Sequence, residues 1–295
     1  MRFAATALVA LLSLAAVPSP GPGPDLEQRV DAGQAVTAGH KELTAGHVDI
    51  GPRYRDGEWT VLVHDDTAVP PVWRPLSDVV LRVPDAAVQE VPADPAYAFL
   101  GREPGTRVHV IPQTQDQQVV WVGWNTQDPG VMDAIARGVT MSLLGVEGPG
   151  GMVVFLQNGD LGAPTVLWDT GKPYPQPVWV DTNTHTHANW VFTAPGVYLA
   201  LVEFSADLAG GGTVSAREVV RFAVGDATPA ADAFAASLTA PVASPGGTAP
   251  PAAAAPDGGG NALLGALIAV AAAVLVAGLV RAGLRARRVR REAAR

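Results

Sequence analysis

Residues 190–204 read WVFTAPGVYLALVEF, and this stretch decides the fold. Pro195-Gly196 separates two apolar runs, which is typical of a turn between strands. The second run is rich in β-branched and aromatic residues, so we expect it to begin a late hairpin with Val219 to Val224 as the closing strand. Aromatic side chains in such a hairpin bury large apolar areas. The aromatic residues expected in the core are Trp190, Phe192 and Tyr198.

Short β-rich runs continue outward from this hairpin over most of the chain. Pro, Gly, Asp and Asn fill the gaps between them from residue 44 onward, at intervals typical of an all-β domain. Two stretches, residues 76–90 and 128–138, are compatible with a short helix. We therefore predict an all-β fold, an immunoglobulin-like antiparallel β-sandwich over residues 38–226, built as one domain or as two β lobes.

The amino-terminal residues 1–20 have the order of a secretory signal peptide. Arg2 is followed by an apolar run and then by small residues. The alternative is a buried amino-terminal helix, but the prolines of residues 18–24 would break it. We therefore expect the mature protein outside the cytoplasm.

Residues 262–280 form an apolar run without charges that is long enough to cross a bilayer as a helix. Seven arginines follow in residues 281–295, and basic residues mark the cytoplasmic side of a span. The alternative, a core helix with a basic end, lacks a globular partner at this position. We predict a single-pass type I protein of the cell membrane, with 262–280 as transmembrane helix, 281–295 as cytoplasmic tail and an extracellular ectodomain. Residues 227–261 are rich in Pro, Ala and Gly and are expected to form a stalk.

Composition excludes several chemistries. The chain has no cysteine, which rules out disulfides, thiolate ligands and cysteine nucleophiles. The net charge is −8, yet residues 262–295 and Arg2 together carry +7, so about −15 remains on the rest. Such acidity argues against nucleic acid as a partner and favours cations or basic surfaces.

The segment NTHTHANW, residues 183–190, carries the strongest indication of chemistry. In an extended chain, alternation places His185 and His187 on one face, where two imidazoles can share a metal ion. His47 and Asp49 repeat the same spacing in GHVDI, residues 46–50. If the two strands meet, these four side chains make a site for zinc, manganese or a similar divalent ion. The alternative is that they line the polar face of half-buried strands.

Two further groups are weaker metal candidates, His40 and His64 with its neighbours Asp65 and Asp66. Motifs of catalysis are lacking: the sequence contains no Gly-x-Ser-x-Gly elbow, no His-Glu-x-x-His helix and no phosphate-binding loop. We therefore expect no enzyme and no catalytic residue.

Seven motifs in this order resemble a known family, the actinobacterial surface-anchored protein domain, also described as the choice-of-anchor M domain. They are GHVDI (46–50), DGEW (56–59), IPQTQ (111–115), WVGWN (121–125), GVEGPG (145–150), HTHANW (185–190) and FTAPGVY (192–198). The resemblance implies a surface protein of high-GC Gram-positive bacteria that often accompanies an ABC transporter with a zinc or manganese binder. The family brings no established catalytic residues, and its Leu-Pro-x-Thr-Gly sorting motif is missing here.

Two functions from different classes follow from these features. The first is a membrane-tethered extracellular binding protein that serves a divalent-metal ABC uptake system. The second is a cell-surface adhesion or scaffold protein whose histidines are structural. The distance between His47 and His185 tests the metal site, because ring nitrogens more than about 6 Å apart cannot share one ion without rearrangement. The surface partner separates the two functions: a transporter component indicates the first, and a matrix or cell partner indicates the second.

Overall fold

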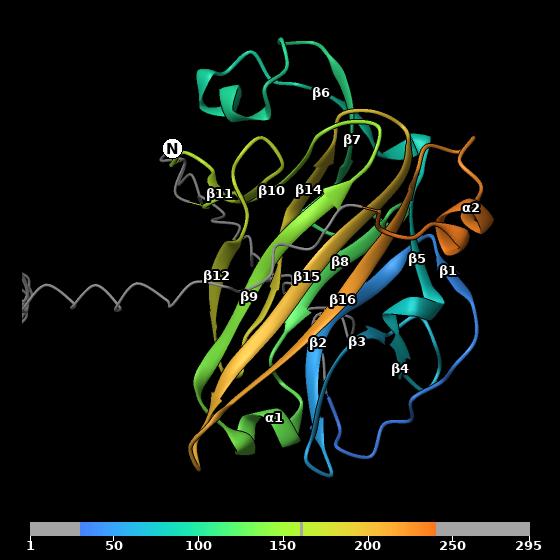
Figure 1. Cartoon of the computed structure of the whole chain (residues 1–295). Helices are drawn as coiled ribbons and strands as arrows, with labels where there is room; N and C mark the ends of the chain where they lie inside the picture. Colours follow the sequence, from blue (N-terminus) through green and yellow to red (C-terminus); the bar gives the residue numbers. More distant parts are fainter. Residues whose placement is uncertain (1–29, 160–161, 240–295) are drawn as a thin grey trace, which may run out of the picture. The chain divides into compact units, whose positions relative to one another are not determined.

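The computed structural model describes residues 30–159 and 162–239 of the chain (Figure 1). These residues all belong to one compact unit. The predicted signal peptide, transmembrane helix and cytoplasmic tail lie outside the described residues, as does the predicted stalk beyond residue 239. Within the part that is described, no helix has the length and apolar character needed to cross a membrane.

The described strands form three sheets, and the prediction of an all-β fold is confirmed. The long sheet has the strand order β1 (Lys41–Leu43), β5 (Val79–Val83), β16 (Thr213–Val224), β15 (Gly196–Leu208), β9 (Ile135–Glu147) and β12 (Gln176–Asp181). The site sheet has the order β13 (His185–His187), β8 (Val120–Asn125), β2 (Gly46–Arg55), β3 (Glu58–Asp65) and β4 (Val72–Pro75). The third sheet has the order β11 (Thr165–Asp169), β10 (Met152–Leu156), β14 (Asn189–Phe192), β7 (Arg107–Ile111) and β6 (Val88–Glu90).

The late hairpin expected from the sequence forms the two central strands of the long sheet. β15 begins at Gly196, where φ is +136°, and pairs antiparallel with β16 along its length (Figure 1). The other edge of β15 pairs with β9. Tyr198 is fully buried and its hydroxyl donates to the carbonyl of Ala194 at 2.9 Å, which ties the Pro-Gly turn to the strand.

The three sheets share one hydrophobic core. Phe192 contacts Tyr198 and Phe222 through ring centroids 5.0 and 4.9 Å apart, and Trp190 stands edge-on to Trp168. Burying a phenylalanine side chain stabilises the fold by about 1.5–3 kcal/mol relative to leaving it exposed. The expectation that these aromatic residues are core residues is therefore confirmed.

The sheets differ from the expected antiparallel arrangement at three strand pairs. β1 with β5, β5 with β16, and β2 with β8 run parallel. Parallel neighbours need long crossover connections rather than hairpins, and periodicity within one strand contains no information about its partner. The parallel pairing of β2 with β8 brings the motif at residues 46–50 next to that at 121–125.

Short helices lie close to where the sequence allowed them. Within 128–138, α1 covers Pro129–Ala134 with Asp128 as its cap, and within 76–90 two 3-10 turns, η2 (Leu76–Asp78) and η3 (Asp85–Ala87), flank β5. Two others, η4 (Pro95–Leu100) and α2 (Ala230–Ala235), were not expected from the sequence. Helix α2 lies inside the range predicted for the stalk, yet its Ala233 is buried against Val80 and Ala223. The folded part therefore extends beyond residue 226.

Candidate metal centre

Strand order places the four predicted ligands around one strand of the site sheet. β8 lies between β13 and β2, so residues from these two strands flank it. Gly123 of β8 is in register with His187 on one side and with Asp49 on the other. The alternation of side chains then puts His47, Asp49, His185 and His187 on the same face. One ligand atom from each lies within 4.8 Å of all the others, so the group could hold a metal ion.

The three imidazole rings converge through the same nitrogen. Nε2 of His47 lies 2.9 Å from Nε2 of His187 and 3.1 Å from Nε2 of His185, and the last two nitrogens are 3.0 Å apart. These separations are well inside the limit of about 6 Å beyond which two ring nitrogens cannot share an ion. Two metal–nitrogen bonds of 2.0–2.1 Å place their nitrogens roughly 3 Å apart in either tetrahedral or octahedral geometry. The observed spacing thus fits coordination to a shared ion.

Asp49 supplies the carboxylate of the group and is completely buried. Its Oδ2 accepts a hydrogen bond from Asn125 Nδ2 at 3.2 Å and lies 3.2 Å from His185 Nε2. Among residues 30–159 and 162–239, no group donates a hydrogen bond to its Oδ1. Burial raises the pKa of Asp49, but the hydrogen bond with His185 and the neighbouring imidazoles outweigh that effect, and the net pKa is lowered. An ionised, buried oxygen without a donor is suited to bind a cation.

His187 is held ready for coordination by its surroundings. Burial is the main cause that lowers its pKa to about 3, so the ring is neutral at physiological pH. Its ring stacks on Trp121, with centroids 3.7 Å apart and an angle of 11° between planes. Neutral imidazole is the form that binds metal ions. Of the four side chains His185 is the most exposed, at 19 %, and gives the group its contact with solvent.

Three residues of WVGWN shape this centre, and none of them was assigned to it from the sequence. Trp121, Gly123 and Asn125 alternate along β8 and register with the ligand strands. A Cβ atom on Gly123 would lie 2.6 Å from the Thr186 carbonyl oxygen and 2.8 Å from Cε1 of His187, so only glycine leaves room for the ligands. The alternation of these three residues can be read from the sequence, but their place beside the four candidate ligands depends on the order of the strands β13, β8 and β2.

The weaker metal candidates do not join the group. His40 stacks on Phe234 at 4.0 Å, and Asp65 accepts from Arg74 Nε at 2.7 Å. His64 and Asp66 lie behind His47 and contact it through Asp66. Asn189 follows His187 by two residues but accepts from the backbone N–H of Gln113 at 2.9 Å, because the chain leaves the site sheet after His187 and enters the third sheet.

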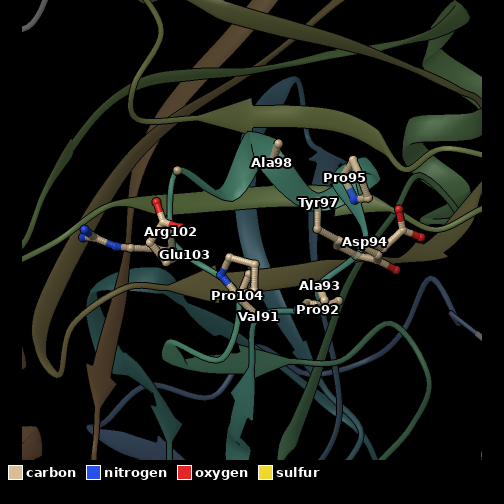
Figure 2. A pocket seen from close by; sticks show the side chains of 11 residues that line it. Val91, Pro92, Ala93, Asp94, Pro95, Tyr97, Ala98, Arg102, Glu103 and Pro104 are labelled. Atoms are coloured by element: carbon tan, nitrogen blue, oxygen red, sulfur yellow. The ribbon is translucent and has the colours of Figure 1, made fainter.

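A separate surface hollow of about 390 Å³ lies at the η4 segment (Figure 2). Prolines and Tyr97 contribute to its wall, and two of its charged groups have structural partners. Asp94 caps η4 by accepting from Ala96 N, and Arg102 donates to Thr193 Oγ1. In Figure 2 these two charged side chains lie at opposite ends of the hollow and do not converge. The hollow therefore does not have the features of a chemical site.

Comparisons with protein-family models, with curated proteins and with solved structures each gave no match for this chain. The function is therefore inferred from the geometry of the four residues and from the sequence.

Proposed function

We propose that this chain is a membrane-tethered extracellular binding protein, with an immunoglobulin-like ectodomain, that holds a divalent ion, zinc or manganese, for an ABC uptake system. The single observation that carries the proposal is the convergence of three Nε2 atoms and a buried carboxylate from β2 and β13.

Hydrogen bonding among the histidines does not account for this convergence. His47 Nδ1 lies 2.5 Å from Asp66 Oδ2, so its proton is used there and its Nε2 carries a lone pair. His185 and His187 then supply at most two Nε2 protons to serve three nitrogen pairs and the contact with Asp49. A cation replaces these protons and satisfies all four groups together.

The ligand types narrow the choice of ion. Imidazole nitrogen suits zinc and other borderline transition metals, whereas one carboxylate with three histidines offers too few oxygens for calcium. Four protein ligands also fill a tetrahedral shell, which favours holding a zinc ion over catalysis with it. This supports a binding protein rather than an enzyme.

The cellular part of the proposal rests on the sequence. The apolar run 262–280 with its arginine-rich flank supports a membrane anchor, and residues 1–20 support export. The resemblance to the surface-anchored domain family supports a metal ABC transporter as partner. An acidic ectodomain attracts cations and disfavours nucleic acid.

Metal analysis of the full-length chain tests the binding function. We expect one zinc or manganese ion per chain in the wild type and loss of that ion in H185A and H187A. The matched control is H109A, because His109 is a buried histidine of β7 that pairs with Asp85 outside the group. Equal metal content in wild type, H187A and H109A would rule the site out.

Capture of surface partners separates this proposal from an adhesion or scaffold role. A transporter component recovered with the wild type, and lost in H185A, supports the uptake function. Recovery of a matrix or cell-surface partner in equal amounts with the wild type and with H185A supports the scaffold function instead.

A further inference from the structure

A chain of polar side chains runs from the back of the metal centre into the core of the site sheet. His47 Nδ1 lies 2.5 Å from Asp66 Oδ2, and Asp66 Oδ1 lies 3.2 Å from His64 Nδ1. His64 Nε2 lies 2.9 Å from Gln34 Oε1, which is also 3.1 Å from Trp73 Nε1. Both His64 and Trp73 are completely buried.

The indole of Trp73 fixes the direction of these hydrogen bonds. An indole N–H can only donate, so Gln34 Oε1 is the acceptor and the second donor to it is the Nε2–H of His64. A carboxylate can only accept, so His47 presents its Nδ1–H to Asp66 Oδ2, and the other oxygen of Asp66 lies 3.2 Å from His64 Nδ1. His64 therefore links Asp66 to Gln34 through its two ring nitrogens.

This direction leaves His47 with a defined tautomer. With the proton on Nδ1, the lone pair of His47 is on Nε2, the atom that faces His185 and His187. Metal-binding histidines commonly donate their other N–H to a carboxylate, which orients the ring and strengthens its basicity. Burial alone would raise the pKa of Asp66, but the hydrogen bonds from His47 and His64 outweigh it and keep the carboxyl ionised.

We propose that Asp66, anchored by His64, is the positioning residue that fixes His47 as an Nε2 ligand of the metal centre. The inference rests on the proposed metal-binding function and deepens it. Neither Asp66 nor His64 is a ligand in it, since Asp66 faces His47 Nδ1, on the far side of the ring from Nε2, and His64 directs its Nε2 to Gln34.

Two variants and a matched control test the role of Asp66 in the full-length chain. D66A removes the acceptor, and D66N keeps the volume but loses the charge. The control is D85A, because Asp85 makes the same kind of contact with His109, 3.1 Å from its Nε2, on another sheet. Zinc affinity is measured by competition with a chromogenic chelator. Thermal unfolding of the metal-free chains checks that each variant folds.

We expect D66A and D66N to bind zinc about 10- to 100-fold more weakly than the wild type, while D85A binds as the wild type does. In the metal-free wild type, nitrogen-15 NMR of labelled histidines should show His47 as the Nδ1–H tautomer, and in D66A this preference should be lost. A purely structural role would not move the tautomer signal.

The outcomes distinguish this inference from the proposed function. Zinc binding by the wild type with unchanged affinity in folded D66A and D66N overturns the positioning role and leaves the metal site standing. An Nε2–H tautomer of His47 in the metal-free wild type also overturns the positioning role. Absence of zinc binding in the wild type overturns both proposals.

Discussion

Replacement of Gly123 by alanine tests whether the centre is built over a bare backbone. The added Cβ would lie 2.6 Å from the carbonyl oxygen of Thr186 and 2.8 Å from Cε1 of His187, and it would also collide with Oδ1 of Asp49. Ordinary contacts begin near 3.4 Å, so His187 must move by about 0.6 Å and the Thr186 backbone by about 0.8 Å. Both shifts exceed the tolerance of about 0.2 Å in metal–ligand distances.

The expected magnitudes follow from this collision. Overpacking a well-filled site costs about 1–3 kcal/mol, while replacing glycine by alanine in a compatible conformation returns about 0.4–1 kcal/mol by restricting the unfolded chain. G123A should therefore lower the free energy of unfolding by about 1–2 kcal/mol. Displacement of two ligands should weaken zinc binding by about 100-fold or more, equivalent to about 2.8 kcal/mol.

The assay pairs urea unfolding of the metal-free chain with zinc titration of the folded chain. G145A is the matched control, because Gly145 lies in strand β9 and a Cβ there meets nothing within 4 Å. G145A should keep the zinc affinity of the wild type and should raise the free energy of unfolding by about 0.4–1 kcal/mol instead of lowering it. Wild-type zinc affinity in a folded G123A chain would refute the idea that the ligands need a bare backbone at this position.

Three further predictions concern the described part of the chain. For His187, whose folded pKa of about 3 lies below its usual 6.5, the unfolded state binds more protons between these values; stability of the metal-free chain should fall by about 1.4 kcal/mol per pH unit as pH drops below 6.5. The lowered pKa values of Asp49 and Asp66 add a further loss of stability below about pH 4. Urea unfolding between pH 7.5 and 4.5 checks the role of His187, because the free energy of unfolding of H187Q should not change with pH in this range. D128A should lower the free energy of unfolding by about 3–5 kcal/mol, because it leaves the buried Arg53 guanidinium without the carboxylate 3.1 Å away and removes the cap of α1. Thermal unfolding measures the loss, and a loss below about 1 kcal/mol would contradict this reasoning. Y198F should cost about 1 kcal/mol through the lost bond to Ala194, and equal unfolding midpoints for Y198F and wild type would show that this bond adds nothing.

Local pattern in the sequence was sufficient for the fold class and for the late hairpin. The turn at Pro195-Gly196 marks the start of β15, and the β-rich runs that follow it define β15 and β16, because strand propensity and turn chemistry act over a few residues. The same locality explains what was missed. Helix α2 lies in an Ala- and Pro-rich stretch, and it is the burial of Ala233 against Val80 and Ala223 that gives it a place in the fold.

Periodicity also selected the residues of the candidate centre, because alternation in an extended chain sets His47 with Asp49 and His185 with His187. Periodicity could not predict that the two pairs meet, since they lie far apart in the sequence. They meet because their strands, β2 and β13, are the two neighbours of β8 in the site sheet. The space over Gly123, the stacking of Trp121 and the hydrogen bond from His47 to Asp66 all depend on strand order and register. The sequence by itself selected the four side chains of the candidate centre and the strand face that each takes. The tertiary structure decided that they converge on one point, because contacts between distant strands are fixed by packing of the whole sheet rather than by local propensity.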